Sequence, residues 1–299
     1  MRLKEVFNKL NRDNLILLRD AEFDTINYCT SEETRRFIGF LEKEKFLDKI
    51  NPNMKCVICK NDFVDKLPKE IEGVIISNEP KADWYRIYDI WAKEIKVNEM
   101  RKPSQIGINC DISRMAYVAE NNVKIGNNVT IEPFACIHEN VTIGDNCIIH
   151  SGTIVGGRSF SKARTENEVL ELVDLGQTVL EKNVELYSHV HIANGILPSD
   201  ITYIGENSKL DAHIYVGHGT KLGKKVFIAA GAVLAGNCVI GDNVWIGVNA
   251  TVSNRIIIGN NARVSLGAVV TKNVGESETV TGNFAINHEK FISLLRNYR

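Results

Sequence analysis

The chain has 299 residues, of which 44% are hydrophobic and 24% are charged, and this is enough for two domains and a large buried core. Its 36 Lys and Arg residues balance 37 Asp and Glu residues, so the composition gives no reason to propose nucleic acid or an anionic membrane as a partner. Charges run through residues 1–18, and no apolar run in the chain approaches membrane-spanning length. We therefore expect no signal peptide, no membrane span and a cytoplasmic location.

Residues 1–102 predict a small α/β domain, because short apolar runs alternate there with helical patterns. In chain order we expect a helix over 3–10, a strand over 14–18, a helix that Ser31 caps and that continues through 35–50, buried strands at 56–59 and 73–77, and a helix that begins at Pro80. Apolar and aromatic side chains share one face of that last helix, and we interpret them as core.

The seven cysteines show no framework of spacings, which is typical of reduced thiols. Cys56 and Cys59 form one CxxC pair. Because a zinc site normally needs four ligands and no second pair lies nearby, we interpret this pair as part of a buried strand.

A six-residue unit, here called a hexad, is repeated twelve times without a gap from Ile204 to Val274. The first residue of each hexad is aliphatic: Ile204, Leu210, Val216, Leu222, Ile228, Leu234, Ile240, Ile246, Val252, Ile258, Val264 and Val270. Second positions are small except at Asp211, and fourth positions are Asn or Gly with three exceptions, as expected where the backbone has a positive φ. This period is the signature of a parallel β-helix, in which three hexads form one triangular coil. We predict a left-handed parallel β-helix over residues 103–274, followed by a loop and a short basic helix over 275–299.

Extending the register backward to Ile106 gives eight coils, or about 38 Å of solenoid at the usual strand spacing. One extra residue follows Val118. A long insertion of about two dozen residues, GRSFSKARTENEVLELVDLGQ (157–177) and its neighbours, follows Val155, and a short insertion, ILPSDITY (196–203), follows Ile192. All three leave the third hexad of a coil, so we expect them to emerge from one corner. We expect the long insertion to lack regular structure and to serve function.

His218 is the most promising catalytic candidate, because its hexad position places it at the corner from which the insertions emerge. The register stacks it over Asn194, with Gly236 on the next coil and Arg255 about 10 Å away, two coils up. We expect Asp211, one hexad earlier, to orient the imidazole.

His213 stacks over His189 on another corner, with His191 nearby. Adjacent histidines on such a ladder are more often solvated than metal-bound, and we expect no metal there.

The segments VDLGQTVLEKNVELYSHVHIANG, IGENSKLDAHIYVGHGTKLG and TGNFAINHEKFI resemble the UDP-3-O-acylglucosamine N-acyltransferases of lipid A synthesis and their relatives that acylate nucleotide-linked amino sugars. The family has an aspartate seven residues before its catalytic histidine, matched here by Asp211 and His218. FLEKEKF resembles the family's uridine-binding phrase, with Phe40 and Phe46 at the two aromatic positions that sandwich the base.

Two positions depart from that family pattern. Lys43 replaces an amide-bearing residue between the aromatics, and Arg255 falls where the lipid A enzymes have a second active-site histidine. A relative that acts on another UDP- or dTDP-linked amino sugar, for lipid A or another surface polysaccharide, fits at least as well. We count Asn194, at the corner of His218, with Phe40, Lys43, Phe46 and Arg255 as substrate-binding residues.

The resemblance implies an N-acyltransferase that uses acyl-CoA or an acyl carrier protein as co-substrate and holds no permanent cofactor. An imidazole suits the deprotonation of an amine, and the backbone N–H of Gly236 suits an oxyanion. The resemblance also implies a homotrimer. We expect a neighbouring subunit to complete the active corner, because a flat solenoid edge offers no enclosed pocket.

Two other functions stay open at this stage. One is an O-acetyltransferase of a small acceptor, because fold alone does not decide the acceptor. The other is a non-catalytic solenoid, or a bicarbonate- or metal-binding relative with three histidines around a cation between subunits, for which His189 and His213 are the residues to examine.

Overall fold

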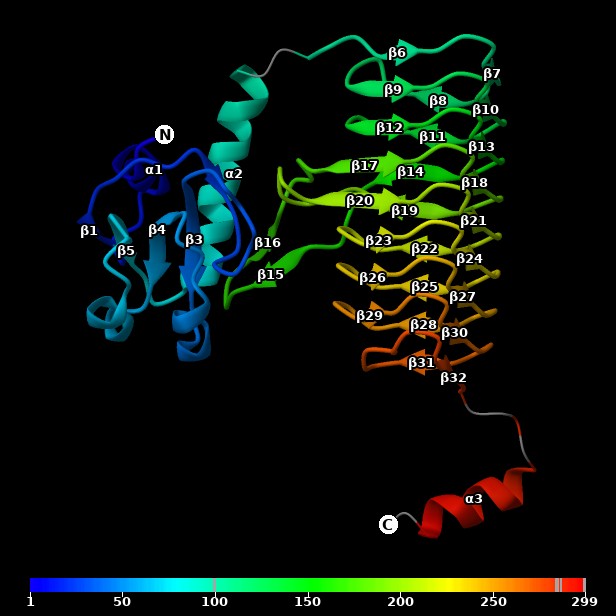
Figure 1. Cartoon of the computed structure of the whole chain (residues 1–299). Helices are drawn as coiled ribbons and strands as arrows, with labels where there is room; N and C mark the ends of the chain where they lie inside the picture. Colours follow the sequence, from blue (N-terminus) through cyan, green and yellow to red (C-terminus); the bar gives the residue numbers. More distant parts are fainter. Residues whose placement is uncertain (99–100, 283–284, 286, 298–299) are drawn as a thin grey trace.

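The computed structural model describes residues 1–98, 101–282, 285 and 287–297 and contains two main bodies, an α/β domain and a three-sided solenoid (Figure 1). The solenoid is a left-handed parallel β-helix, as predicted. A segment after it leads to α3 (His288–Asn297).

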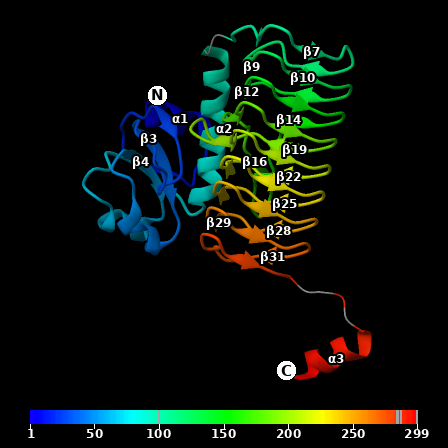
Figure 2. The ribbon, with the colours of Figure 1, turned by 45° about the vertical axis from the view of Figure 1, so that its right-hand side comes forward.

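The α/β domain is built on a five-stranded sheet of order β1-β5-β4-β3-β2, parallel except for β1. Its elements are α1 (Leu3–Leu10), β1 (Ile16–Arg19), β2 (Thr25–Ile26), β3 (Phe37–Leu41), the 3₁₀ helix η1 (Glu44–Lys49), β4 (Met54–Cys59), the 3₁₀ helix η2 (Asn61–Lys66), β5 (Gly73–Ile76) and α2 (Pro80–Asn98). Apolar residues of α1 and α2 pack with one side of this sheet, and those of η1 and η2 pack in a separate cluster. Figure 2 shows α2 between the sheet and the solenoid.

The predicted helix through residues 35–50 is wrong, because the segment forms β3 and η1 instead. Ser31 caps no helix and lies in the loop before β3. Strand β3 lies between β2 and β4 and is buried on both sides, so its run FIGFL is apolar throughout. A continuous apolar run of this kind does not distinguish a buried parallel strand from a buried helix.

Three parallel sheets form the faces of the solenoid. The first face contains β6 (Gln105–Ile106), β9 (Val123–Ile125), β12 (Val141–Ile143), β17 (Gln177–Leu180), β20 (Ile201–Ile204), β23 (Lys221–Leu222), β26 (Val239–Ile240) and β29 (Ile257–Ile258). The second contains β7 (Asp111–Ile112), β10 (Thr130–Ile131), β13 (Ile148–Ile149), β18 (Glu185–Leu186), β21 (Lys209–Leu210), β24 (Phe227–Ile228), β27 (Trp245–Ile246), β30 (Arg263–Val264) and β32 (Thr279–Val280). The third contains β8 (Tyr117–Val118), β11 (Cys136–Ile137), β14 (Ile154–Gly157), β19 (His191–Ala193), β22 (Tyr215–Val216), β25 (Val233–Leu234), β28 (Thr251–Val252) and β31 (Val269–Val270).

The predicted register is confirmed throughout the stack. Ile143 pairs with Leu180 across the long insertion, and Ile192 pairs with Val216 across the short one. From Ile125 onward the aliphatic first positions form one continuous buried core, whereas Ile106 in the first coil is 53% exposed. From Asn207 to Gly267 every fourth position has a positive φ, including the exception Arg255 at 62°. Stacking continues past the predicted end at residue 274, because β32 pairs with β30.

The long insertion has regular structure, contrary to expectation, in the form of an antiparallel hairpin of β15 (Lys162–Arg164) and β16 (Val169–Glu171). Apolar side chains from this insertion and from the short one join the core of the α/β domain; they include Ala163, Leu172, Ile196 and Leu197. The Tyr88 hydroxyl donates to the carbonyls of Val173 (2.8 Å) and Ile196 (2.9 Å), one in each insertion. The insertions therefore fasten the α/β domain to the solenoid.

Cys56 and Cys59 lie in the buried strand β4, as predicted, and burial raises their pKa values to about 12 and about 11. In the described ranges, no helix combines the length and hydropathy that crossing a bilayer requires.

Replacement of Tyr88 by Phe tests the attachment between the two bodies. Removing the hydroxyl leaves the Val173 carbonyl without this donor, so we expect a loss of about 1–3 kcal/mol in the free energy of unfolding. Tyr117→Phe, which alters a side chain that is 53% exposed, serves as the control. Equal stability of the two variants in denaturant titrations would contradict this role of Tyr88.

Candidate active site

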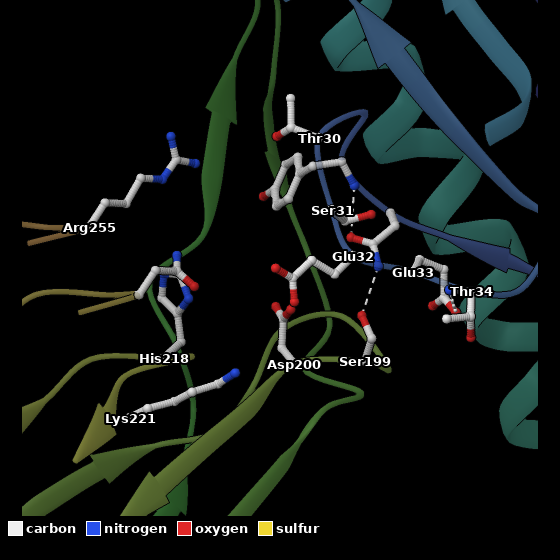
Figure 3. Close-up of a pocket in the computed structure, with 13 residues that line it drawn as sticks. Thr30, Ser31, Glu32, Glu33, Thr34, Ser199, Asp200, His218, Lys221 and Arg255 are labelled. Carbon is white, nitrogen blue, oxygen red and sulfur yellow. Dashed lines mark hydrogen bonds between the residues drawn. The ribbon is translucent and has the colours of Figure 1, made fainter. Parts of the chain in front are cut away.

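A cavity of about 610 Å³ lies where the α/β domain meets the solenoid. One wall is the loop from Asn27 to Thr34, which is here called the facing loop. The short insertion contributes Ser199 and Asp200, and the solenoid contributes His218, Lys221, Asn237 and Arg255. Figure 3 shows His218 and Arg255 on one side of this space and the facing loop on the other. The wall opposite His218 thus comes from the same chain, and the expected neighbouring subunit is not needed to form it.

The facing loop is fixed to the short insertion by a buried amide. Asn27 Nδ2 donates to Ser199 Oγ at 2.7 Å, and Asn27 Oδ1 accepts the backbone N–H of Tyr28 at 2.9 Å. Because both ends of this side chain are bonded, the two walls hold a defined spacing.

His218 lies two residues after β22 and is partly buried. Its Nδ1 is buried and has no hydrogen-bond partner among the described residues. Burial lowers the pKa of the imidazole, the carboxylates of Asp200 and Asp174 act to raise it, and Arg255 acts to lower it further. The net direction is downward, so the imidazole is neutral near pH 7 and able to accept a proton.

Gly236 lies on the next coil against the imidazole, as the register predicted. A Cβ at this position would be 2.6 Å from His218 Nε2, so a larger residue would displace the ring. In the described part of the chain, the Gly236 N–H has no acceptor, whereas the Gly236 carbonyl accepts from Arg255 N at 3.0 Å. This free N–H beside the imidazole has the properties of an oxyanion donor.

Two carboxylates of the insertions, Asp200 and Asp174, act on the pKa of His218, and the sequence analysis did not identify them. Burial raises the pKa of Asp200, whose Oδ2 accepts the Leu197 N–H at 3.1 Å. Burial also raises the pKa of Asp174, whose Oδ2 accepts the Ser159 N–H at 2.8 Å. The only available signal was their position in insertions that leave the corner of His218.

The structure does not bring Asp211 to His218. Asp211 directly follows β21 on the second face, whereas His218 follows β22 on the third. Asp211 is exposed, its carboxylate accepts the N–H of Ala212 at 2.7 Å, and it is not among the charges that shift the pKa of His218. The predicted orienting role is therefore not met within one chain, because successive hexads lie on different faces.

Asn194 lies beneath the corner as predicted, but its side chain is used internally. It is 4% exposed, accepts from Thr178 Oγ1 at 3.0 Å and donates to the Gly176 carbonyl at 3.1 Å. The predicted role of Asn194 in binding substrate is therefore not supported. Its amide instead binds Gly176 and Thr178, where the long insertion rejoins the coil.

Phe40 and Phe46 do not form the predicted aromatic sandwich. Phe40 packs against Trp84, with ring centroids 5.4 Å apart, in the cluster that contains α2. Phe46 packs in the other cluster of the domain, with η1 and η2. Lys43 is exposed at the start of η1, and none of the three lines the cavity. The prediction fails because β3 replaces the expected helix and alternates its side chains between the two clusters.

Arg255 lies at the predicted corner and lines the cavity, and Lys221 lines the same cavity. Neither has an ion-pair partner within 4.0 Å among the described residues. Two cations near a neutral imidazole suit a ligand with phosphate groups.

The histidine ladder is a stacked pair, with the rings of His189 and His213 5.1 Å apart and 8° from parallel. Within the described ranges, no three potential ligands gather around one point that could hold a metal ion.

Comparison with models of known protein families identifies similarity in the solenoid. The model for bacterial transferase hexapeptide repeats matches residues 122–157, 201–236 and 237–272. These three stretches of the solenoid are similar to bacterial transferase hexapeptide repeats. The predicted family resemblance is also confirmed by the curated relatives.

Among those relatives, a UDP-3-O-acylglucosamine N-acyltransferase from Coxiella burnetii is 23% identical over 224 residues, which cover 66% of this chain and 60% of the relative. One from Polynucleobacter asymbioticus is 32% identical over 114 residues, 37% of this chain and 31% of the relative. The chain thus spans less than two thirds of the length of these curated relatives. Among solved structures, a UDP-N-acetylglucosamine acyltransferase from Campylobacter jejuni has a TM-score of 0.54 at 23% identity, covering 65% of this chain and 79% of the other. It supports the hexapeptide solenoid fold.

Two imidazoles of the hexapeptide solenoid should titrate on opposite sides of the ordinary histidine pKa of about 6.5. His218 should titrate below it, because burial dominates. His150 should titrate above it: burial lowers its pKa, but hydrogen bonds to Glu185 (3.1 Å) and Glu132 (2.9 Å) outweigh that effect. Histidine NMR titrations, assigned with His218→Gln and His150→Gln, measure both values, and the reverse order would contradict this electrostatic description.

Proposed function

We propose that the protein is an N-acyltransferase that moves an acyl group from a pantetheine thioester to the amino group of a UDP- or dTDP-linked amino sugar. The donor is acyl-CoA or an acyl carrier protein, and the product serves lipid A or another surface polysaccharide. The observation that carries the proposal is the unpartnered, partly buried imidazole of His218 beside Gly236 in the cavity. The similarity to curated N-acyltransferases supports the same chemistry.

In this mechanism the acceptor nitrogen attacks the thioester carbonyl carbon while neutral His218 takes a proton from the nitrogen. The negative charge on the carbonyl oxygen is stabilised by the Gly236 N–H. The carbon–sulfur bond then breaks, the amide forms, and the imidazolium returns its proton to the leaving thiolate. Every proton and electron pair is accounted for without a metal or another co-reactant.

Arg255 and Lys221 are the proposed phosphate-binding residues. Both line the cavity and lack ion-pair partners in the described ranges. A nucleotide diphosphate would gain charge-assisted hydrogen bonds from both side chains.

We also propose that the protein is a homotrimer. Large apolar side chains remain exposed around all three faces of the last three coils: Phe227, Val233, Val239, Trp245, Val248, Ile257, Leu266 and Val269. Exposed apolar side chains of this kind are available for contacts between subunits. Sedimentation should give three times the mass of one chain, and a fully active monomer would contradict the trimer.

His218→Ala should lower kcat by about 10²–10⁴-fold and leave the binding of donor and acceptor largely unchanged, because the base acts only in the chemical step. His213→Ala is the matched control, since His213 is a corner imidazole outside the cavity, and it should retain wild-type kcat. Steady-state assays with a panel of nucleotide amino sugars and acyl thioesters measure both. A kcat near the wild-type value for His218→Ala from pH 6 to 8 would refute the assignment.

A further inference from the structure

Two carboxylates that come from different bodies meet in the cavity. Glu32 belongs to the facing loop and Asp200 to the short insertion, and both line the space that contains His218. Figure 3 shows their carboxylates pointing toward one another, across the cavity from the imidazole. The hydrogen bond from Asn27 to Ser199, next to Asp200, holds the two segments together.

Neither carboxylate is held in an ion pair, although the charge of Lys221 acts to lower the pKa of Asp200, which burial raises. Among the described residues, Glu32 and Asp200 have no ion pair within 4.0 Å, and the Asp200 carboxylate accepts the N–H of Leu197 at 3.1 Å. The adjacent Glu33 provides a contrast, because Arg35 binds it at 3.0 Å and removes it from this role. Glu32 is exposed and Asp200 is partly buried. The two carboxylates bring more negative charge to this side of the cavity than Lys221 offsets, so the pair favours a cationic ligand.

We propose that Glu32 and Asp200 dock the protonated amine of the acceptor and make the site selective for amino sugars. This inference rests on the proposed function and deepens it. An ammonium group is a compact charge with three N–H donors, and two facing carboxylates from separate segments can accept from it together. A hydroxyl or an amide at the same point has no charge and leaves both carboxylates uncompensated.

The same arrangement connects recognition to the reaction. Before attack, the ammonium group must release one proton to solvent, so that the free amine can attack. Neutral His218 then takes the second proton during attack, and the charges of Asp200 and Asp174 stabilise the imidazolium so formed. After acylation the nitrogen belongs to a neutral amide. The product therefore loses both ion pairs, which favours its release.

The test compares binding of an amine with binding of its own N-acetylated form. Calorimetry is carried out on the full chain with UDP-glucosamine and UDP-N-acetylglucosamine, and with dTDP-4-amino-4,6-dideoxyglucose and its N-acetylated form. We expect the wild-type protein to bind the amine of at least one pair about tenfold or more tightly than the amide. Because nucleotide contacts are common to both members of a pair, the ratio isolates the amine.

The double variant Glu32→Gln, Asp200→Asn should reduce this ratio to about one while the affinity for the amide stays within about twofold of wild type. Glu166→Gln, an exposed carboxylate outside the cavity, should leave the ratio unchanged. The ratio is measured on one protein sample, so a partly unfolded variant changes both affinities equally and does not imitate the result.

Three outcomes overturn the inference in distinguishable ways. Equal wild-type binding of amine and amide refutes the docking role and leaves the acyltransferase proposal standing. A preference that persists in the double variant places amine recognition on other residues. Failure of every nucleotide sugar to bind the wild-type protein refutes the proposed acceptor and this inference with it.

Discussion

The six-residue period of the solenoid is the constraint on which the rest of the structure depends. Each hexad delivers one aliphatic side chain to a common interior, and each buried Ile, Leu or Val contributes about 1.5–3 kcal/mol of transfer free energy. Because the core is continuous from coil to coil, corner residues add little to stability and are free to vary. The site occupies one such corner, where His218, Gly236 and Arg255 lie on successive coils in positions that packing does not require.

A corner alone is open to solvent, and the two insertions change that. They leave the solenoid at the level of His218, bury apolar side chains in the α/β domain and bond to Tyr88 and Asn27. The facing loop then forms the opposite wall. The low pKa of His218 follows from this enclosure, because burial is its largest cause. Attachment of the domain and activation of the imidazole are thus two consequences of the same contacts.

The sequence predicts the solenoid well because its signal is local and repeated twelve times, so the register of every coil follows from one pattern. The same register predicts His218, Gly236 and Arg255 at one corner. It does not predict Asp200, Asp174 or the facing loop, because these reach the corner through segments without a period. The assignment of Asp211 came from its hexad position and from family resemblance, and it places Asp211 on a different face from His218. The assignments of Phe40 and Phe46 came from family resemblance and depend on local structure that differs here, above all the strand β3 in place of a helix.

The central claim is that the acceptor sugar binds between the facing loop and the solenoid, with its reacting nitrogen at His218. The most direct measurement is a crystal structure of the full chain with a bound nucleotide amino sugar. The account predicts the nitrogen within hydrogen-bonding distance of the His218 imidazole, with the phosphates near Arg255 and Lys221. A nucleotide sugar bound only to the α/β domain outside this cavity, with its amine remote from His218, would contradict it.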